Sequence, residues 1–353
     1  MTKAVVVGGA GLIGSHTVEE LMRRGFEVKV IDALVEGSPQ HIVDGAEFVH
    51  ADVRSLTATH FKGADTIYHL AAIGGVFMDD PYMLSVNVVG TATVLDAAKA
   101  AGVRRVVYAS SQAVYGPGQY MDCRSHGGKY DWSRTESDLR QHRWDPYCSA
   151  CWEVHTPVAL RESHPTSART VYAKSKLLAE ELVLSAKDIE TIALRYALVY
   201  GPRQSRQNPY TGICSIFAQR ARNGLRPIVY EDGLQTRDFT YVTDVARANV
   251  AASEMRIRWQ RVFNIGTGVP TTVLDFAKMI APDSEPLLSS EYRPDDARHM
   301  VTNTLLSQEL KWRAEVPVEE GVKRYLEWFN RQDNVPDVTE RAYARLKEEG
   351  VIV

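Results

Sequence analysis

An alternation of strand-like and helix-like segments runs through the first 200 residues and restricts the fold more than any other feature. Residues 3–9 form an almost continuous apolar run, which is typical of a strand buried on both faces of a parallel sheet. Further strand-like segments lie at 26–32, 46–53, 66–72, 105–111 and 191–201, and helix-like segments lie at 15–24, 84–102 and 171–187. This order predicts an α/β protein with a doubly wound parallel sheet.

Two stretches depart from the alternation. After residue 200, short helices and Pro/Gly turns predict a smaller C-terminal lobe. Residues 117–170 show neither helical nor strand periodicity, which predicts an insertion. A chain of 353 residues is also longer than one core usually needs. We therefore expect a first domain at 1–198, interrupted by the insertion at 117–170, and a second lobe at 199–353.

The turn between the first strand and the first helix is rich in glycine. Gly8, Gly11 and Gly14 are spaced G-x-x-G-x-x-G, and Gly9 begins an overlapping G-x-G-x-x-G. Glycines let a pyrophosphate approach the backbone, and the helix N-terminus supplies amide donors. Asp32 ends the next strand, where a carboxylate can accept the ribose hydroxyls of an adenosine, and no arginine follows it directly to bind a 2′-phosphate. The pattern therefore favours a Rossmann site for NAD over NADP, with a tight structural turn as the alternative.

Tyr172 and Lys176 lie one turn apart on a predicted helix, after a strand that ends at Ser111. The same Tyr-x-x-x-Lys spacing occurs at Tyr343 and Lys347, where no such strand precedes it. A tyrosine has an ordinary pKa of about 10, which a lysine ammonium and an oxidised nicotinamide would lower. The Ser111 hydroxyl could orient a substrate hydroxyl toward Tyr172. These groups are typical of the oxidation of a secondary alcohol with NAD as hydride acceptor.

The insertion holds three of the four cysteines. Cys123 and His126 form a Cys-x-x-His pair, and Cys148 and Cys151 form a Cys-x-x-Cys pair. Two such pairs are typical of a structural, tetrahedral zinc site; buried free cysteines and a disulfide are the alternatives. Residues 117–170 contain seven basic and seven acidic side chains, so their zero net charge does not favour a nucleic-acid finger. We expect a zinc-pinned flap beside the catalytic cleft.

Taken together, the motifs resemble the extended short-chain dehydrogenase/reductases, specifically the NAD-dependent nucleotide-sugar epimerases and dehydratases. The ordered set consists of "GGAGLIG" (8–14), Asp32 with "ADV" (51–53), "HLAA" (69–72), Asn87, "SSQAVYG" (110–116), "YAKSK" (172–176), "LRYALVYGPR" (194–203), "RDFTYVTDVA" (237–246), "FNIGTG" (263–268) and "YRPDDARH" (292–299). The insertion and "NPYTGICSIF" (208–217) are similar to those of dTDP-L-rhamnose 4-epimerase-like proteins. The resemblance covers nearly the whole chain, and it implies that the second lobe binds the substrate.

The resemblance also implies roles for single residues. In the catalytic group, Tyr172 would be the base, Lys176 its partner on the nicotinamide ribose, and Ser111 the orienting hydroxyl. The implied cofactor contacts are Gly8, Gly11, Leu12, Ile13, Gly14, Asp32, Asp52, Val53, Leu70, Ala71, Ala72, Asn87, Tyr172 and Lys176. The implied substrate contacts are Ser111, Gln112, Leu198, Asn208, Arg237 and Arg293. The two arginines would hold the diphosphate, because guanidinium groups bind phosphate in a forked geometry.

The residues after Ser111 narrow the reaction that the resemblance implies. Dehydratases and decarboxylases of the family carry acids at the positions of Gln112 and Ala113, and 3,5-epimerases carry a cysteine at the second. Elimination leaves a nucleotide-sugar 4-epimerase: oxidation at C4 by tightly bound NAD, a 4-keto intermediate, and hydride return to the opposite face. A 4-ketoreductase, an epimerase at another carbon and a non-catalytic dinucleotide-binding protein are the alternatives. Leu198 replaces a usual asparagine, which predicts an altered sugar or substrate pose.

Composition and charge exclude other classes of partner. The chain has 41 basic and 44 acidic side chains, a net charge of −3, so no overall field attracts nucleic acid or an anionic membrane. No apolar run reaches the ~18 residues of a membrane-spanning helix, and no secretory signal is visible. We expect a cytoplasmic enzyme. The Ala- and Leu-rich helices at 84–102 and 171–187, together with the resemblance, predict a homodimer that packs as four helices.

Overall fold

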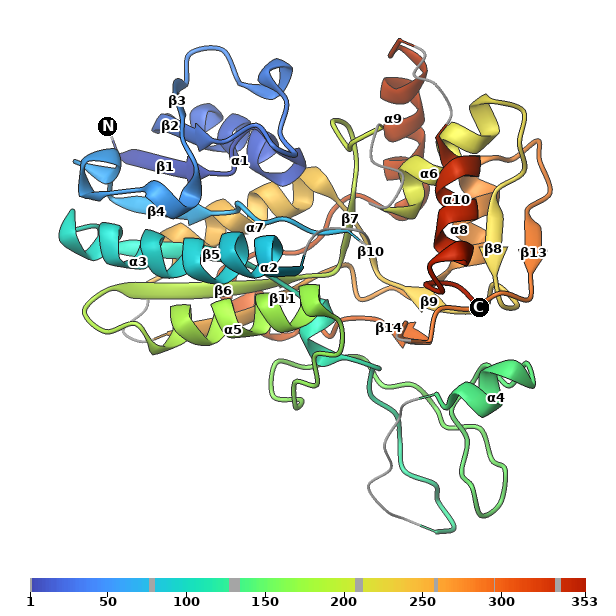
Figure 1. Cartoon of the computed structure of the whole chain (residues 1–353). Coiled ribbons are helices and arrows are strands. Elements are labelled where there is room, and N and C mark those ends of the chain that lie inside the picture. Colours follow the sequence, from blue (N-terminus) through green and yellow to red (C-terminus); the bar gives the residue numbers. More distant parts are fainter. Residues whose placement is uncertain are drawn as a thin grey trace.

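The larger lobe of the protein is built on a seven-stranded parallel sheet (Figure 1). The computed structural model describes residues 2–75, 80–126, 134–206, 212–256, 260–294, 296–333 and 338–353. Across the sheet the strands are β3 (Glu47–His50), β2 (Glu27–Asp32), β1 (Lys3–Val7), β4 (Thr66–His69), β5 (Arg105–Ser111), β6 (Glu190–Tyr196) and β11 (Arg261–Ile265). The order reverses between β1 and β4, and ligands of doubly wound sheets bind at the carboxyl end of that switch point.

Helices cover both faces of this sheet. On one face lie α1 (Leu12–Arg23) and α7 (Val242–Glu254); on the other lie α3 (Gly90–Ala100) and α5 (Val171–Ser185). Side chains of β1 alternate between the two cores: Val5 and Val7 pack toward α3 and α5, and Ala4 and Val6 pack toward α1 and α7. This arrangement explains why the strands read as continuous apolar runs, and it confirms the predicted doubly wound sheet.

The segment before α3 departs from a regular helix. It begins with α2 (Asp80–Leu84) and passes through one π-helical turn at Ser85–Val89 before α3 begins. The sequence predicted a single helix over 84–102. Turns of this kind occur mostly as local bulges and often mark functional positions. This one contains Asn87, which was among the predicted site residues.

The predicted strand at 191–201 breaks in two at Ala197. Its backbone N–H still bonds to the carbonyl of Ile265 in the main sheet (2.9 Å), whereas that of Leu198 bonds to the carbonyl of Asp238 (2.9 Å). The chain therefore changes sheets here, and β7 (Leu198–Tyr200) pairs with β10 (Phe239–Tyr241) in the smaller lobe.

The smaller lobe combines short strands with four helices. The remaining strands are β8 (Ile228–Tyr230), β9 (Thr236–Arg237), β12 (Thr271–Thr272), β13 (Leu287–Ser289) and β14 (His299–Met300). The helices are α6 (Ile213–Arg222), α8 (Val273–Ile280), α9 (Val318–Asn330) and α10 (Thr339–Glu348). Residues beyond 198 also return to the larger lobe, because α7 packs on α1 and β11 pairs with β6. The lobes are thus interleaved along the chain.

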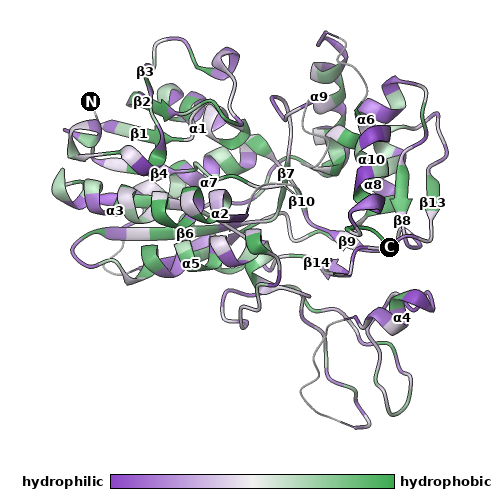
Figure 2. Ribbon diagram, in the orientation of Figure 1, coloured by the Kyte–Doolittle hydropathy of each residue, from purple (hydrophilic) through white to green (hydrophobic). Residues whose placement is uncertain are grey.

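The insertion leaves the carboxyl end of β5 after the short turn Gln112–Tyr115, projects below the sheet in the view of Figure 1, and returns to α5. Its described residues include the short helix α4 (Glu136–Arg140), which is largely hydrophilic, whereas hydrophobic residues gather on the sheet strands (Figure 2). Among the described residues, no helix is both long and apolar enough to cross a membrane.

Candidate active site

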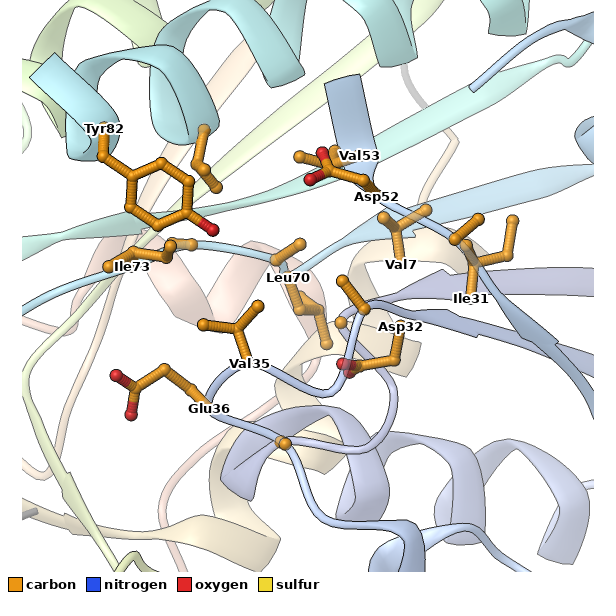
Figure 3. Close-up of a pocket in the computed structure, with 18 residues that line it drawn as sticks. Val7, Ile31, Asp32, Val35, Glu36, Asp52, Val53, Leu70, Ile73 and Tyr82 are labelled. Atoms are coloured by element: carbon orange, nitrogen blue, oxygen red, sulfur yellow. The ribbon is translucent and has the colours of Figure 1, made fainter. Parts of the chain in front are cut away.

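A cleft opens at the carboxyl ends of β1, β2 and β4, at the switch point of the sheet (Figure 3). It brings together eight of the predicted cofactor residues: Gly8, Gly11, Asp32, Asp52, Val53, Leu70, Ala71 and Ala72. The sequence did not single out Val35, Glu36 and Tyr82, which also line it. Their side chains surround the opening in Figure 3. They come from a loop and from the start of α2, where no motif marks them.

The glycines of the first turn are required for different reasons. Gly8 has a φ of +87°, and a Cβ on it would lie 2.5 Å from the backbone nitrogen of Ala71. A Cβ on Gly14 would lie 2.0 Å from the carbonyl oxygen of Gly8. These two glycines therefore let the backbone pack on itself. A Cβ on Gly11 would meet only that same oxygen, at 3.4 Å, so Gly11 leaves the surface open toward a ligand.

The beginning of α1 faces the same cleft. Its N-cap is Gly11, which offers no side-chain capping bond, and Leu12, Ile13 and Gly14 form the first turn. The first N–H groups of a helix have no partner within the helix and carry partial positive charge. This turn can therefore receive a pyrophosphate, so the residues present fit the dinucleotide that the sequence predicted.

Asp32 combines a structural task with a position in the cleft. One carboxylate oxygen accepts a hydrogen bond from the N–H of Ala10 (2.9 Å), and the other accepts one from the N–H of Leu34 (2.7 Å). Both bonds fix the carboxylate at the rim of the cleft (Figure 3). Asp52 is held differently, because hydrogen bonds from Arg54 lower its pKa and keep it ionised.

Tyr172 lies in the first turn of α5 and faces Ser111 at the end of β5. The neighbouring Ser110 donates to Glu180 (2.5 Å), two turns further along the same helix. Burial raises the pKa of Tyr172, and a hydrogen bond with Ser111 opposes that rise. The Tyr172 ring packs against Gly74, where a Cβ would lie 3.1 Å from ring atom Cε2. No motif in the sequence marks Gly74.

Lys176 lies one turn further along α5 and is fully buried. Its Nζ is 4.6 Å from the centroid of the Tyr108 ring, a cation–π distance. Burial lowers the pKa of Lys176 to about 7, and the charge of Glu180 opposes the shift. A lowered Tyr172 pKa in the loaded enzyme stays a prediction.

Asn87 joins two walls of the site. Its Oδ1 accepts from the N–H of Ile73 (2.8 Å), and its Nδ2 donates to the carbonyl of Ile73 (2.9 Å) and to the Ser175 hydroxyl (2.9 Å). The π-helical turn brings this amide between the loop after β4 and α5. Asn87 therefore fixes α5, with Tyr172 and Lys176, against the cofactor cleft.

Two further cavities lie next to each other between the lobes. The inner cavity, about 520 Å³, is lined by residues that include Ser111, Gln112 and Tyr172. The outer cavity, about 300 Å³, lies in the smaller lobe and includes Arg293. Both cavities share four lining residues: Leu198, Gly212, Arg237 and Asp296. The predicted Asn208 lies outside the described residues.

Arg237 stands at this shared wall. Its guanidinium pairs with the Asp296 carboxylate (2.8 Å) and donates to the carbonyl of Thr236 (2.8 Å). Burial raises the pKa of Asp296, but the charges of Arg237, Arg293 and Arg134 outweigh it, so that pKa is lowered. The sequence missed Asp296 and Arg134. On the inner side, the buried Oε1 of Gln112 has no hydrogen-bond partner among the described residues, which leaves it free to accept from a ligand.

The four predicted metal ligands lie together at the far end of the insertion. Cys123 Sγ is 3.5 Å from both His126 Nδ1 and Cys151 Sγ, and Cys148 Sγ is 3.8 Å from His126 Nδ1. All four ligand atoms lie within 4.8 Å of one another. Ligands of tetrahedral zinc stand about 3.4–3.8 Å apart, whereas a disulfide needs about 2.05 Å. None of the four cysteines forms a disulfide in the structure. The geometry fits a four-ligand zinc site.

A glycine-lined cleft at the switch point of a parallel sheet, with serine, tyrosine and lysine beside it, defines a dinucleotide-dependent short-chain dehydrogenase/reductase with an enlarged second lobe. The model of the NAD dependent epimerase/dehydratase family matches residues 4–136 and 150–266. The chain belongs to this family. The match leaves out residues 137–149, which lie within the insertion.

Individual relatives are similar over almost their whole length. The dTDP-L-rhamnose 4-epimerase of Burkholderia thailandensis is 33% identical, over 94% of this chain and 95% of its own. The UDP-glucose 4-epimerase of Mycolicibacterium smegmatis is 31% identical, over 94% of this chain and 99% of its own. The solved structure of MoeE5 in complex with UDP-glucuronic acid and NAD has a TM-score of 0.75 and 29% identity, and it covers 93% of this chain and 99% of its own.

Proposed function

We propose that this protein is a nucleotide-sugar 4-epimerase that keeps NAD bound through its catalytic cycle. The main observation behind the proposal is the arrangement of one cleft and two cavities. They are the dinucleotide cleft, an inner cavity at Tyr172, and an outer cavity joined to the inner one at Arg237. A nucleotide sugar has a matching order of sugar, diphosphate and nucleoside. The sugar occupies the inner cavity, and the diphosphate passes Arg237 toward Arg293.

The chain's own residues would perform the proton transfers. The glycine turn and Asp32 would hold NAD, which would supply the hydride-accepting chemistry when bound. Tyr172 removes the proton of a sugar hydroxyl, and the Ser111 hydroxyl orients that hydroxyl. The buried Lys176 cation stabilises the tyrosinate that forms. Gln112 accepts a hydrogen bond from a neighbouring sugar hydroxyl.

The lining of the inner cavity supports epimerisation over elimination or decarboxylation. Among the described residues that line it, Asp296 is the one acid, and Arg237 pairs with it. Gln112 and Ala113 follow Ser111, so neither of these two positions carries a carboxyl group that could move additional protons at the sugar. The relatives named above as 4-epimerases agree with this choice. Leu198, at the shared wall, adds an apolar contact that favours a sugar or pose different from that of relatives with asparagine.

A direct assay tests the proposal. Purified protein is incubated with UDP-glucose, UDP-galactose, UDP-N-acetylglucosamine and dTDP-L-rhamnose in turn, without added cofactor, and products are identified by NMR. We expect inversion at C4 of at least one substrate with no net NADH formed. Stoichiometric NADH, or a need for added NADPH, would identify a dehydrogenase or ketoreductase instead. NAD that stays bound while none of the nucleotide sugars is converted would favour a non-catalytic dinucleotide-binding role.

We also propose a homodimer formed by α2, α3 and α5. Neighbouring helices expose Leu178 and Leu182 on α5, with Leu84 and Val89 on the adjoining segment. Adjacent exposed leucines on packed helices are typical of an interface. Light scattering at micromolar concentration should give twice the chain mass of 39.4 kDa. A monomer at that concentration would contradict the dimer.

The insertion is proposed to carry one structural zinc ion, held by Cys123, His126, Cys148 and Cys151. All ligands come from the protein, so the metal has no open position for a reaction. We propose a cytoplasmic location, where reducing conditions would keep the cysteine ligands as thiols. Elemental analysis of protein purified without chelator should find about one zinc per chain.

A further inference from the structure

The insertion contacts the smaller lobe through charged side chains as well as through an apolar cluster in which its Leu160 packs with Ala297 and Met300. Arg134 and Asp145 of the insertion meet Glu231, Asp232 and Arg298 of the lobe. The side chains of Arg134 and Glu231 are each 4% exposed, and that of Arg298 is 1% exposed. Buried ion pairs of this kind need several partners in good geometry, because desolvation opposes them.

Arg134 holds the loop that carries Arg293 and Asp296. Its guanidinium pairs with Glu231 (2.5 Å) and donates to the carbonyl oxygens of Asp296 (2.7 Å) and Arg293 (3.3 Å). These two carbonyls belong to the residues whose side chains line the outer cavity. One insertion side chain therefore fixes the backbone on which both of them stand.

Glu231 links the two insertion residues. Its second oxygen binds Arg298 (3.0 Å), and Arg298 binds Asp145 of the insertion (2.9 Å). Glu231 has a φ of +60°, a left-handed conformation that favours glycine and that side chains with a Cβ adopt at a cost. A glutamate at such a position indicates that its carboxylate is needed there.

The same loop also holds the side chain of Arg237 in position. Asp296, whose carbonyl accepts from Arg134, pairs through its carboxylate with Arg237 at the wall shared by the two cavities. A change in the position of this loop would move both arginines. Arg134 and Asp145 also lie in the chain between His126 and Cys148, so the predicted metal closes the loop that bears them.

We propose that Arg134 is a positioning residue for the diphosphate of the substrate and that the insertion is therefore part of the substrate site. Arg134 does not touch the substrate. It fixes the loop at 293–298 so that Arg293 and Arg237 face the diphosphate together. This inference rests on the proposed function, because it takes these two arginines as the diphosphate ligands.

The test compares three variants of the full-length protein. Arg134→Gln removes the guanidinium that holds the loop. Glu231→Gly removes the carboxylate partner of Arg134 and also relieves the strain of the left-handed backbone at position 231. Arg140→Gln is the matched control, because Arg140 lies in the same insertion and, among the described residues, forms its ion pair with the exposed Glu136 on its own helix α4. Calorimetry measures the Kd of UDP and of dTDP, with NAD content, zinc content and Tm measured in parallel.

For Arg134→Gln and Glu231→Gly we expect the Kd of the bound diphosphate to rise about tenfold, with NAD and zinc unchanged. With the active nucleotide sugar, KM should rise by a similar factor while kcat stays within about twofold, because Tyr172 and Ser111 are untouched. Arg140→Gln should match the parent protein. If Arg134 and Glu231 only stabilise the fold, their replacement should instead lower Tm and kcat together.

Two results separate the possible failures. If the parent protein binds UDP or dTDP and both variants bind it equally well, the positioning role of Arg134 is wrong. If the parent binds neither diphosphate, the proposed function itself is wrong. If Arg134→Gln loses zinc or unfolds, the Glu231→Gly variant provides the test instead. If zinc-loaded Glu231→Gly binds the diphosphate as tightly as the parent protein, the inference is wrong.

Discussion

The cofactor cleft and the insertion reach a defined geometry by different means. In the cleft, backbone packs on backbone: a Cβ on Gly14 would lie 2.0 Å from Gly8 O, and one on Gly8 would lie 2.5 Å from Ala71 N. In the insertion, charged side chains and four metal-type ligands connect described segments that are irregular apart from the short helix α4. A cleft made of strand ends therefore tolerates little change in backbone, whereas the insertion depends on a few long side chains and the proposed ion.

The largest effect is expected at the residue that both regions border. Tyr172→Phe should lower kcat by about 10²–10⁴, the range for loss of a general base. The glycine turn is untouched, so NAD should still copurify. Steady-state kinetics and the absorbance of extracted cofactor measure both quantities. Activity close to that of the parent protein would show that another group takes the proton.

Zinc removal should affect the insertion and the cofactor cleft differently. Without the ion, the insertion at 117–126 and 134–170 has no core of its own and should lose amide protection, while the seven-stranded sheet keeps it. The Kd of UDP or dTDP should rise, and NAD should stay bound. Hydrogen exchange before and after chelation gives the comparison, with zinc re-addition as the control. Full protection of a zinc-free insertion would show that the cysteines only pack.

Two glycine variants should sharpen the description of the cleft. Gly14→Ala forces the loop apart and should destabilise the protein by about 1–3 kcal/mol, as overpacking does. Gly11→Ala meets only ordinary contact, so stability should change by less than about 1 kcal/mol. Its methyl group would nevertheless occupy the surface where the pyrophosphate is expected, and NAD should be lost. Denaturant unfolding and cofactor content distinguish these outcomes; NAD retention in Gly11→Ala would contradict the assigned surface.

An effect on stability opposite in sign to that of Gly14→Ala is expected at Lys176. Its pKa is about 7 in the folded protein and about 10.5 ordinarily, so the unfolded chain binds the proton more tightly between these pH values. The stability of the parent protein should therefore rise with pH across this window. Lys176→Met should be inactive yet more stable near pH 7 by about 1–3 kcal/mol, and the difference should shrink toward pH 10. Equal stability at pH 7 would show that the lysine is not penalised by burial.

Much of the larger lobe could be predicted because its signals are local. Apolar runs, helical spacing and glycine turns are properties of neighbouring residues, and they led to the sheet, the cleft and the Ser111–Tyr172–Lys176 group. The π-helical turn at Asn87 and the break at Ala197 were missed for the same reason. Each depends on a partner far away in the chain, Ser175 in one case and Asp238 in the other.

Residue type and spacing along the chain predicted the residues for binding a dinucleotide, exchanging protons and ligating a metal, because that chemistry depends on which groups are present. How these groups are joined depends on the tertiary structure. The inner and outer cavities meet at Leu198, Gly212, Arg237 and Asp296, which the fold gathers from separate segments. Arg134 and Glu231 stand 97 positions apart, and Asp145 and Arg298 stand 153 apart. Charged pairs at such separations follow no sequence period, since their partners come together only after both lobes and the insertion have folded.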